Sequence, residues 1–205
     1  SQFDSALHFY NSSLQLSRKN DYTQLEASAL NNLGLIYWNQ SNYDKALEFF
    51  NKSILKFEKI NKTKGIASSK NNIGMIYNEM RNYGKAIEYH FDALDLYRSI
   101  NDKYGMSACY ANLAIVYSNI DLSDSTYFYS QKSMVLKQEI NDQWGLATIY
   151  TNLAVDFHSN KLYDSSLFYN RKAEKIYSKL KNKNNLASCI SGIGRDLYMV
   201  GQYEE

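Results

Sequence analysis

Four asparagines recur along the sequence with one constant spacing, a 40-residue period: Asn32, Asn72, Asn112 and Asn152. An asparagine amide carries two N–H donors and a carbonyl acceptor, so it can pair with both the N–H and the C=O of a peptide backbone, whatever side chains that peptide has. A regular row of such amides is a candidate site for holding a peptide. The alternative is that these amides hydrogen-bond neighbouring helices of the same protein, and the sequence leaves both interpretations open.

Two carboxylates stand where earlier copies of the same motif carry aliphatic residues. Asp156 and Asp196 are at the positions equivalent to Ile36. A carboxylate near a helix interface requires a cation or hydrogen-bond donors. We predict that Asp156 pairs with Arg195, which lies one position short of a full period further along the chain. The alternative is two solvated carboxylates, as the repeated pattern weakens towards the end of the chain.

No motif in the sequence indicates catalysis, a metal site or a cofactor site. The Gly192-Ile193-Gly194 run has no third glycine at the spacing of a phosphate-binding loop. Histidines and cysteines are scattered and lack the spacing of metal ligands: His8, His90, His158, Cys109 and Cys189. The sequence therefore predicts that the chain is not an enzyme and binds neither a metal nor a cofactor.

Composition narrows the class of partner and the compartment. The 205 residues include 23 Lys and Arg against 21 Asp and Glu, a net charge of +2 that gives no basic footprint for nucleic acid. No run approaches the roughly 20 apolar residues of a membrane span, so we expect no membrane contact by this region. Two distant cysteines favour a reducing compartment such as the cytoplasm, but are too few to exclude a periplasmic location.

The elements that would position the asparagines repeat with the same period. The hexapeptide at 32–37 recurs at 72–77, 112–117 and 152–157, with a degenerate copy at 192–197. Its third residue is always small: Gly34, Gly74, Ala114, Ala154 and Gly194. Because glycine inside a helix costs about 1 kcal/mol relative to alanine, we expect close approach of a partner helix at this position.

Apolar residues spaced by three and four predict two amphipathic helices in each 40-residue unit, separated by short polar turns. The absence of proline agrees with continuous helices. The expected helices are a leading one at 2–19, the pairs 22–40/43–60, 62–80/83–100, 102–119/122–140 and 143–159/163–180, and a closing helix at 184–200.

The runs at 32–37, 42–50 and 84–90 resemble the tetratricopeptide repeat (TPR) pattern, although the period is 40 rather than about 34 and the usual proline is missing. The Asn- and Tyr-rich, proline-free sequence is also similar to TPR sensor and scaffold regions of bacterial signalling proteins. The resemblance implies an all-α fold, a right-handed superhelical α-solenoid of antiparallel helix pairs. It also implies that the first helix of each pair lines a concave groove.

On this basis we expect one solenoid over 1–205. Its parts would be the second helix of a truncated repeat at 1–20, full repeats at 21–60, 61–100, 101–140 and 141–181, and the first helix of a truncated repeat at 182–205. The final Tyr203-Glu204-Glu205 would begin a further second helix. Uncovered ends of such an array favour self-association.

The same resemblance assigns side chains to the groove. In related proteins, asparagines at matching positions hold peptide backbones, which assigns this role to Asn32, Asn72, Asn112 and Asn152. Further predicted groove residues are Asn31, Leu35, Trp38, Asn71, Met75, Ile115, His158 and Arg195. Trp38 would be a natural binding hot spot, or else a structural aromatic. Because Arg195 is the only cation among these residues, a clamp for a peptide's terminal carboxylate is not expected.

Two functions follow from this interpretation. The first is a non-enzymatic module that binds a protein or peptide segment in the groove. The second is the sensor segment of a bacterial two-component or transcriptional regulator whose output domain lies outside this chain. An oligomeric scaffold is a third interpretation. The full-length sequence would distinguish them.

Overall fold

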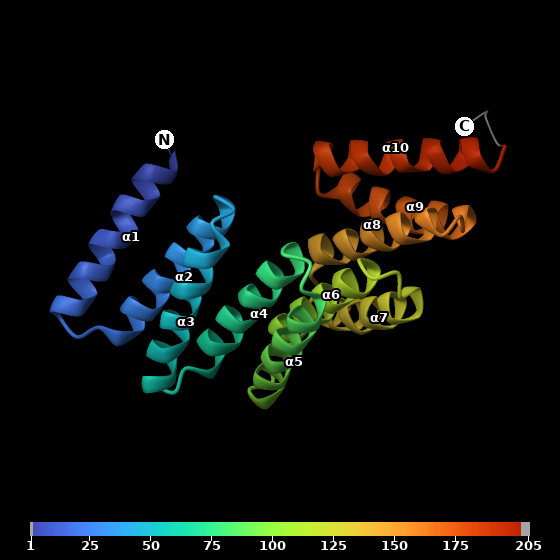
Figure 1. Ribbon diagram of the computed structural model, residues 1–205. Coiled ribbons are helices and arrows are strands. Elements are labelled where there is room, and N and C mark those ends of the chain that lie inside the picture. Colours follow the sequence, from blue (N-terminus) through green and yellow to red (C-terminus); the bar gives the residue numbers. More distant parts are fainter. Residues whose placement is uncertain (1, 202–205) are drawn as a thin grey trace. The chain divides into compact units, whose positions relative to one another are not determined.

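The protein is described by a computed structural model, which covers the backbone of residues 2–201 and the side chains of residues 6–201 (Figure 1). Every helix begins and ends within one residue of the predicted bounds, which confirms the prediction of paired helices; the predicted continuation at Tyr203–Glu205 lies outside the described residues. The helices are α1 (Gln2–Lys19), α2 (Thr23–Asn39), α3 (Tyr43–Lys59), α4 (Thr63–Glu79), α5 (Tyr83–Ser99), α6 (Lys103–Ser118), α7 (Ser123–Glu139), α8 (Gln143–Ser159), α9 (Tyr163–Lys179) and α10 (Lys183–Met199).

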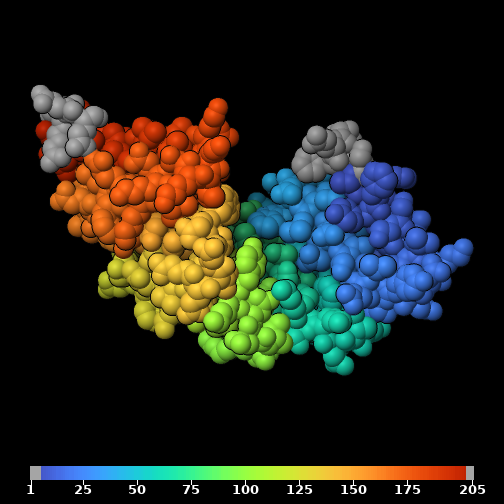
Figure 2. All heavy atoms as spheres, turned by 180° about the vertical axis from the view of Figure 1, so that it is seen from behind, coloured from blue at the N-terminus to red at the C-terminus, as the bar shows by residue number. Residues whose placement is uncertain are grey.

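The chain divides into two compact units, residues 1–109 and 110–205, which are considered separately below. The boundary falls within α6. In each unit, helices that follow one another in sequence pack side by side, as the gradual change of colour across each unit shows (Figure 2). Even-numbered helices from α2 onwards are the first helices of the repeats, and odd-numbered helices from α3 onwards are the second helices.

Each turn between helices contains a residue with left-handed backbone geometry, so these residues recur every 20 positions, from Asp21 to Lys181, with φ between 52° and 61°. At the end of α4, the Asn82 amide donates to the Tyr77 carbonyl at 2.8 Å, and the Arg81 amide donates to the Asn78 carbonyl at 3.0 Å. This pair of bonds is the Schellman motif, which satisfies carbonyls left over at a helix end. This motif explains how the helices end in tight turns without proline.

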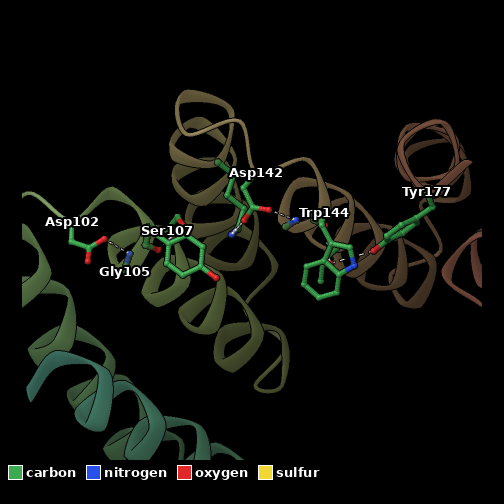
Figure 3. A network of polar contacts seen from close by, with 10 residues as sticks. Asp102, Gly105, Ser107, Asp142, Trp144 and Tyr177 are labelled. Carbon is green, nitrogen blue, oxygen red and sulfur yellow. Dashed lines mark hydrogen bonds and ion pairs between the residues drawn. The ribbon is translucent and has the colours of Figure 1, made fainter. Parts of the chain in front are cut away.

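Aspartates begin two of the first helices. The Gly105 amide donates to Asp102 Oδ1 at 3.0 Å, and the Gly145 amide donates to Asp142 Oδ1 at 2.8 Å (Figure 3). Lys137 Nζ also lies 2.6 Å from Asp142 Oδ2. Burial opposes ionisation of both carboxyls, but hydrogen bonds from lysine and from the glycine amide outweigh it and lower the pKa of each. Each aspartate is therefore held ionised as a helix cap.

Small residues of the first helices receive large side chains of the second helices. A Cβ added at Gly34 would lie 2.8 Å from the Phe50 ring, and one at Gly74 would lie 2.7 Å from the His90 ring. The expected close approach is therefore confirmed at these two glycines. At Gly194, on α10, nothing lies within 4 Å of an added Cβ, and no second helix follows α10 among the described residues, so the prediction is not tested there.

Aromatic pairs stack beside these contacts in every repeat. Ring centroids are 5.2 Å apart in Tyr37–Phe49, 5.5 Å in Tyr77–Tyr89, 5.2 Å in Tyr117–Tyr129 and 5.5 Å in Phe157–Tyr169. One ring of each pair comes from the first helix and the other from the second. These stacks fix the register within each helix pair, and so the face that the first helix presents.

Candidate functional site

In the first unit, two predicted groove residues link neighbouring first helices instead of pointing freely outward. Asn31 Oδ1 accepts hydrogen bonds from Ser69 Oγ at 3.1 Å and from Asn72 Nδ2 at 3.5 Å. Asn71 Oδ1 lies 2.8 Å from His90 Nδ1 and 3.5 Å from Cys109 Sγ. Asn31 and Asn71 thus serve the packing of the unit, which is the interpretation that the sequence left open as the alternative for the asparagine row.

The row itself remains accessible in part. Asn32 and Asn72 are half-buried on α2 and α4, and the 3.5 Å contact to Asn31 uses one N–H of Asn72 at the limit of a hydrogen bond. One helical turn further on, Leu35 and Met75 are also half-buried. Each first helix of this unit therefore presents an amide followed by an apolar side chain on one face.

Trp38 is engaged within the first unit. Its ring is half-buried against the core cluster around Phe50 and Ile73, and its Nε1 donates to Glu79 Oε2 at 2.8 Å. Because Glu79 is on the next first helix, this bond ties α2 to α4. The arrangement favours a structural role for the tryptophan, with one edge of the ring left at the surface.

The second unit exposes more of the predicted site. Asn152 is exposed on α8, Ile115 is 37% exposed on α6, and Asn112 is half-buried. His158 and Arg195 line a recess of about 240 Å³ together with Asp196. The structure thus places Ile115 and Asn152 at the surface, and His158 and Arg195 around a polar hollow.

The predicted ion pair between Asp156 and Arg195 is wrong: no such pair occurs within residues 6–201, and Asp156 Oδ1 instead accepts from Ser118 Oγ at 3.0 Å. The carboxylate that needs partners is Asp196, whose side chain is 1% exposed. His158 Nδ1 lies 2.5 Å from its Oδ1, and its Oδ2 accepts from Ser166 Oγ at 2.6 Å and Asn170 Nδ2 at 3.3 Å.

A common register explains this error. Five of the side-chain pairs that meet between adjacent first helices are separated by 38 positions: Asn31–Ser69, Asn71–Cys109, Ser118–Asp156, Thr151–Cys189 and His158–Asp196. Two further pairs, Asn31–Asn72 and Trp38–Glu79, are separated by 41 positions. One position more than 38 turns the second side chain by about 100° around its helix. The sequence carried the signal, since His158 and Asp196 stand 38 positions apart.

Sequence reasoning did not identify His90 as a distinctive residue. His90 is fully buried at the position that Phe50 occupies one repeat earlier, and its Nε2 is buried without a hydrogen-bond partner. Burial lowers the pKa of His90 to about 4. The ring is therefore neutral at physiological pH, packed on Gly74 and bonded to Asn71. Cys109 is buried beside Asn71, and burial raises the pKa of its thiol to about 12.

Other surfaces of the described residues add little to the site. A charged hollow in the first unit is lined by residues of α1, α2 and α3, among them Arg18, Glu26 and Lys56, and includes none of the predicted groove residues. Across residues 6–201, no three histidine, cysteine or carboxylate side chains are grouped to hold a metal ion. Within the described part of the chain, every helix is too short or too polar to cross a membrane.

Comparison with known proteins identifies the repeat. A tetratricopeptide repeat model matches residues 1–54, and a second model of the same description matches residues 66–102. No curated protein sequence gives a significant match.

Among solved structures, BtubC (BKLC) from P. vanneervenii is similar with a TM-score of 0.87 at 14% identity, over 99% of this chain and 86% of that chain. Aspartyl phosphate phosphatase F from Bacillus subtilis gives 0.79 at 16%, over 92% of this chain and 50% of the other. The Rap conjugation gene regulator of plasmid pLS20, solved with the Phr* peptide, gives 0.71 at 22%, over 91% and 52%. At these identities the likeness shows the fold, a TPR-like α-solenoid, and the chain spans about half the length of the last two proteins.

Proposed function

We propose that the chain is a non-enzymatic tetratricopeptide-repeat module that binds a protein partner through a peptide segment, because tetratricopeptide repeat models match residues 1–54 and 66–102. The observation that carries the proposal is the recurring pair of an asparagine and an apolar residue three positions later, on the same face of successive first helices. In the first unit this pair is Asn32 with Leu35 and Asn72 with Met75, and in the second unit it includes Asn152 with Val155.

The chemistry of this face suits a peptide of modest charge. Asparagine amides can pair with backbone N–H and C=O groups of any sequence, and the neighbouring apolar side chains can take up alternate side chains of the ligand. Asn32, Asn72 and Asn152 are at least partly exposed, whereas Asn31 and Asn71 are committed to internal contacts. The pLS20 regulator, solved with a peptide, supports the same class of ligand.

Selection of binders from a random peptide library, followed by calorimetry, tests the proposal. We expect Asn112→Ala and Asn152→Ala, both in the second unit, each to weaken a selected peptide about tenfold, since two backbone hydrogen bonds are lost. Asn51→Ala is the matched control, because Asn51 is exposed on the second helix α3. If no peptide is selected, or if binding does not depend on Asn112 and Asn152, the proposal fails.

We propose as the alternative that the module is the sensor segment of a regulator. The likeness to the pLS20 conjugation gene regulator, of which this chain covers 52%, favours this assignment. A selected peptide that changes an output of the full gene product would support it, and a full product that consists of repeats alone would contradict it.

Self-association is a further element of the proposal. Large apolar side chains are exposed on both outer helices, including Phe9 at 71% on α1 and Tyr198 at 66% on α10. Contacts through such faces would bury them. Light scattering should show a concentration-dependent mass, and a strict monomer at high concentration would contradict this element.

A further inference from the structure

An apolar recess opens on the surface of the second unit between α6, α7 and α8. Its volume is about 240 Å³. Ile115 and Val155, which are 37% and 57% exposed, form its rim, and Ala114, Thr126, Ser130 and Ile149 form its buried floor. Asn152, one of the asparagine row, also lies at its edge. The hollow is therefore part of the face to which peptide binding is assigned.

The recess exists because one large side chain is missing. Ser130 is equivalent to His90 one repeat earlier and to Phe50 two repeats earlier. Those two rings fill the space in front of Gly34 and Gly74, close enough that an added Cβ would lie within 3 Å of them. In the 101–140 segment a hydroxymethyl group stands in place of the ring, and the space in front of Ala114 is left open.

Two further substitutions enlarge the opening. Ala111 replaces Asn31 and Asn71, whose amides bridge to the next first helix in the first unit. Ser118 replaces Trp38 and Asn78. In the 141–181 segment the equivalent recess has the same volume of about 240 Å³, but polar and charged side chains line it, including Asn170, Arg195 and Asp196. The small residues thus coincide in one repeat.

The walls of the recess are suited to an apolar group. Its polar side chains are largely satisfied within the protein: Thr126 Oγ1 donates to the Leu122 carbonyl at 3.2 Å, and Ser118 Oγ donates to Asp156 at 3.0 Å. Among the described residues, no charged side chain lines the recess. An apolar cavity of about 150 Å³ is sufficient to hold benzene. A single phenylalanine or leucine side chain therefore matches both the size and the chemistry of the space.

We propose that the apolar recess is the anchor pocket for one large apolar side chain of the bound peptide, the external equivalent of the Phe50 ring. This inference rests on the proposed peptide-binding function and specifies its ligand. Asn152 at the edge of the recess pairs with the peptide backbone next to the anchor residue. The module therefore selects segments with a phenylalanine- or leucine-sized residue at one fixed position.

Benzyl alcohol is a suitable probe, because it supplies the ring without a peptide backbone. In the full chain with labelled methyl groups, titration should give saturable NMR shifts at Ile115, Ile149 and Val155, while Ile73 and Ile76 of the first unit stay unchanged. The double variant Ala114→Gly/Ser130→Phe rebuilds the Gly34–Phe50 pair and should abolish these shifts. Absence of saturable shifts in the wild type, or their survival in the double variant, would overturn the proposal.

A single substitution at the rim tests the recess independently, in case the double variant does not fold. Val155→Asp places a charge at the mouth and should weaken the probe at least tenfold, whereas Val135→Asp, at a similarly exposed valine outside the recess, should leave it unchanged. Equal effects of the two variants would contradict the assignment.

Selected peptides separate this inference from the proposed function. Those selected on the wild type should share one large apolar residue and should lose at least tenfold affinity for the double variant. Peptides that depend on Asn112 and Asn152 but bind the double variant equally well would contradict the anchor pocket and leave the proposed function intact. Failure to select any peptide would remove the proposed function, and a peptide anchor with it, even if benzyl alcohol binds.

Discussion

Replacing His90 by phenylalanine exchanges a buried titratable ring for the ring that Phe50 places at the equivalent position. His90 is 0% exposed, and burial lowers its pKa from 6.5 to about 4. Between these pH values the unfolded chain binds more protons than the folded chain. The contribution of the neutral His90 ring to the unfolding free energy is therefore fully present above pH 6.5 and is lost as the pH falls towards 4. At 1.36 kcal/mol for each pKa unit, the full loss is about 3 kcal/mol, of which about 2 kcal/mol is lost by pH 5.

Urea unfolding of the wild type and of His90→Phe, at pH 7.5 and at pH 5, measures this effect. The variant loses the His90–Asn71 contact at both pH values, so the readout is the change in unfolding free energy between them. We expect this change to be about 2 kcal/mol smaller in the variant. All other ionisable groups are common to both proteins, so their contributions to the difference cancel. Equal losses of stability in the two proteins would refute the reasoning.

Three further predictions concern the stability of the fold. Gly84→Ala should stabilise α5 by about 1 kcal/mol, because nothing lies within 4 Å of the added Cβ. Gly105→Ala should destabilise the fold by about 1–3 kcal/mol, because its Cβ would lie 2.2 Å from the Tyr97 ring. Urea midpoints of the two variants that move in the same direction would contradict this expectation. Arg81→Gly should raise the unfolding free energy by about 1 kcal/mol by relieving a left-handed φ of 58°, and a loss of stability would show that the arginine side chain matters more. Asp196→Leu should cost about 3 kcal/mol, because it leaves three hydrogen-bonding groups without their acceptor, while Asp196→Asn should cost less; equal costs would refute the network.

The 40-residue period predicted the fold in detail. Each helix was expected within one residue because the turns recur at fixed positions, and the left-handed residues from Asp21 to Lys181 show why. The tight contact at Gly34 was also predictable, because a glycine inside a helix needs a reason. Such local rules are strong where every repeat carries the same residue type.

The side-chain partners were harder to predict. Pairing of Asp156 with Arg195 was expected from near-equivalent positions in adjacent repeats, but the side chains that meet here are 38 positions apart, which brings Asp196 to His158 and Asp156 to Ser118. One residue of register decides which side chain faces the neighbouring helix. The apolar recess was missed for another reason: Ser130 becomes informative only once the structure shows that Phe50 and His90 fill the equivalent space.

A crystal structure of the chain with a peptide selected from a random library tests the central claim most directly. The account predicts that the amides of Asn112 and Asn152, both in the second unit, lie within hydrogen-bond distance of the peptide backbone. A peptide bound to the second helices, or one whose backbone does not contact these asparagines, would contradict the account.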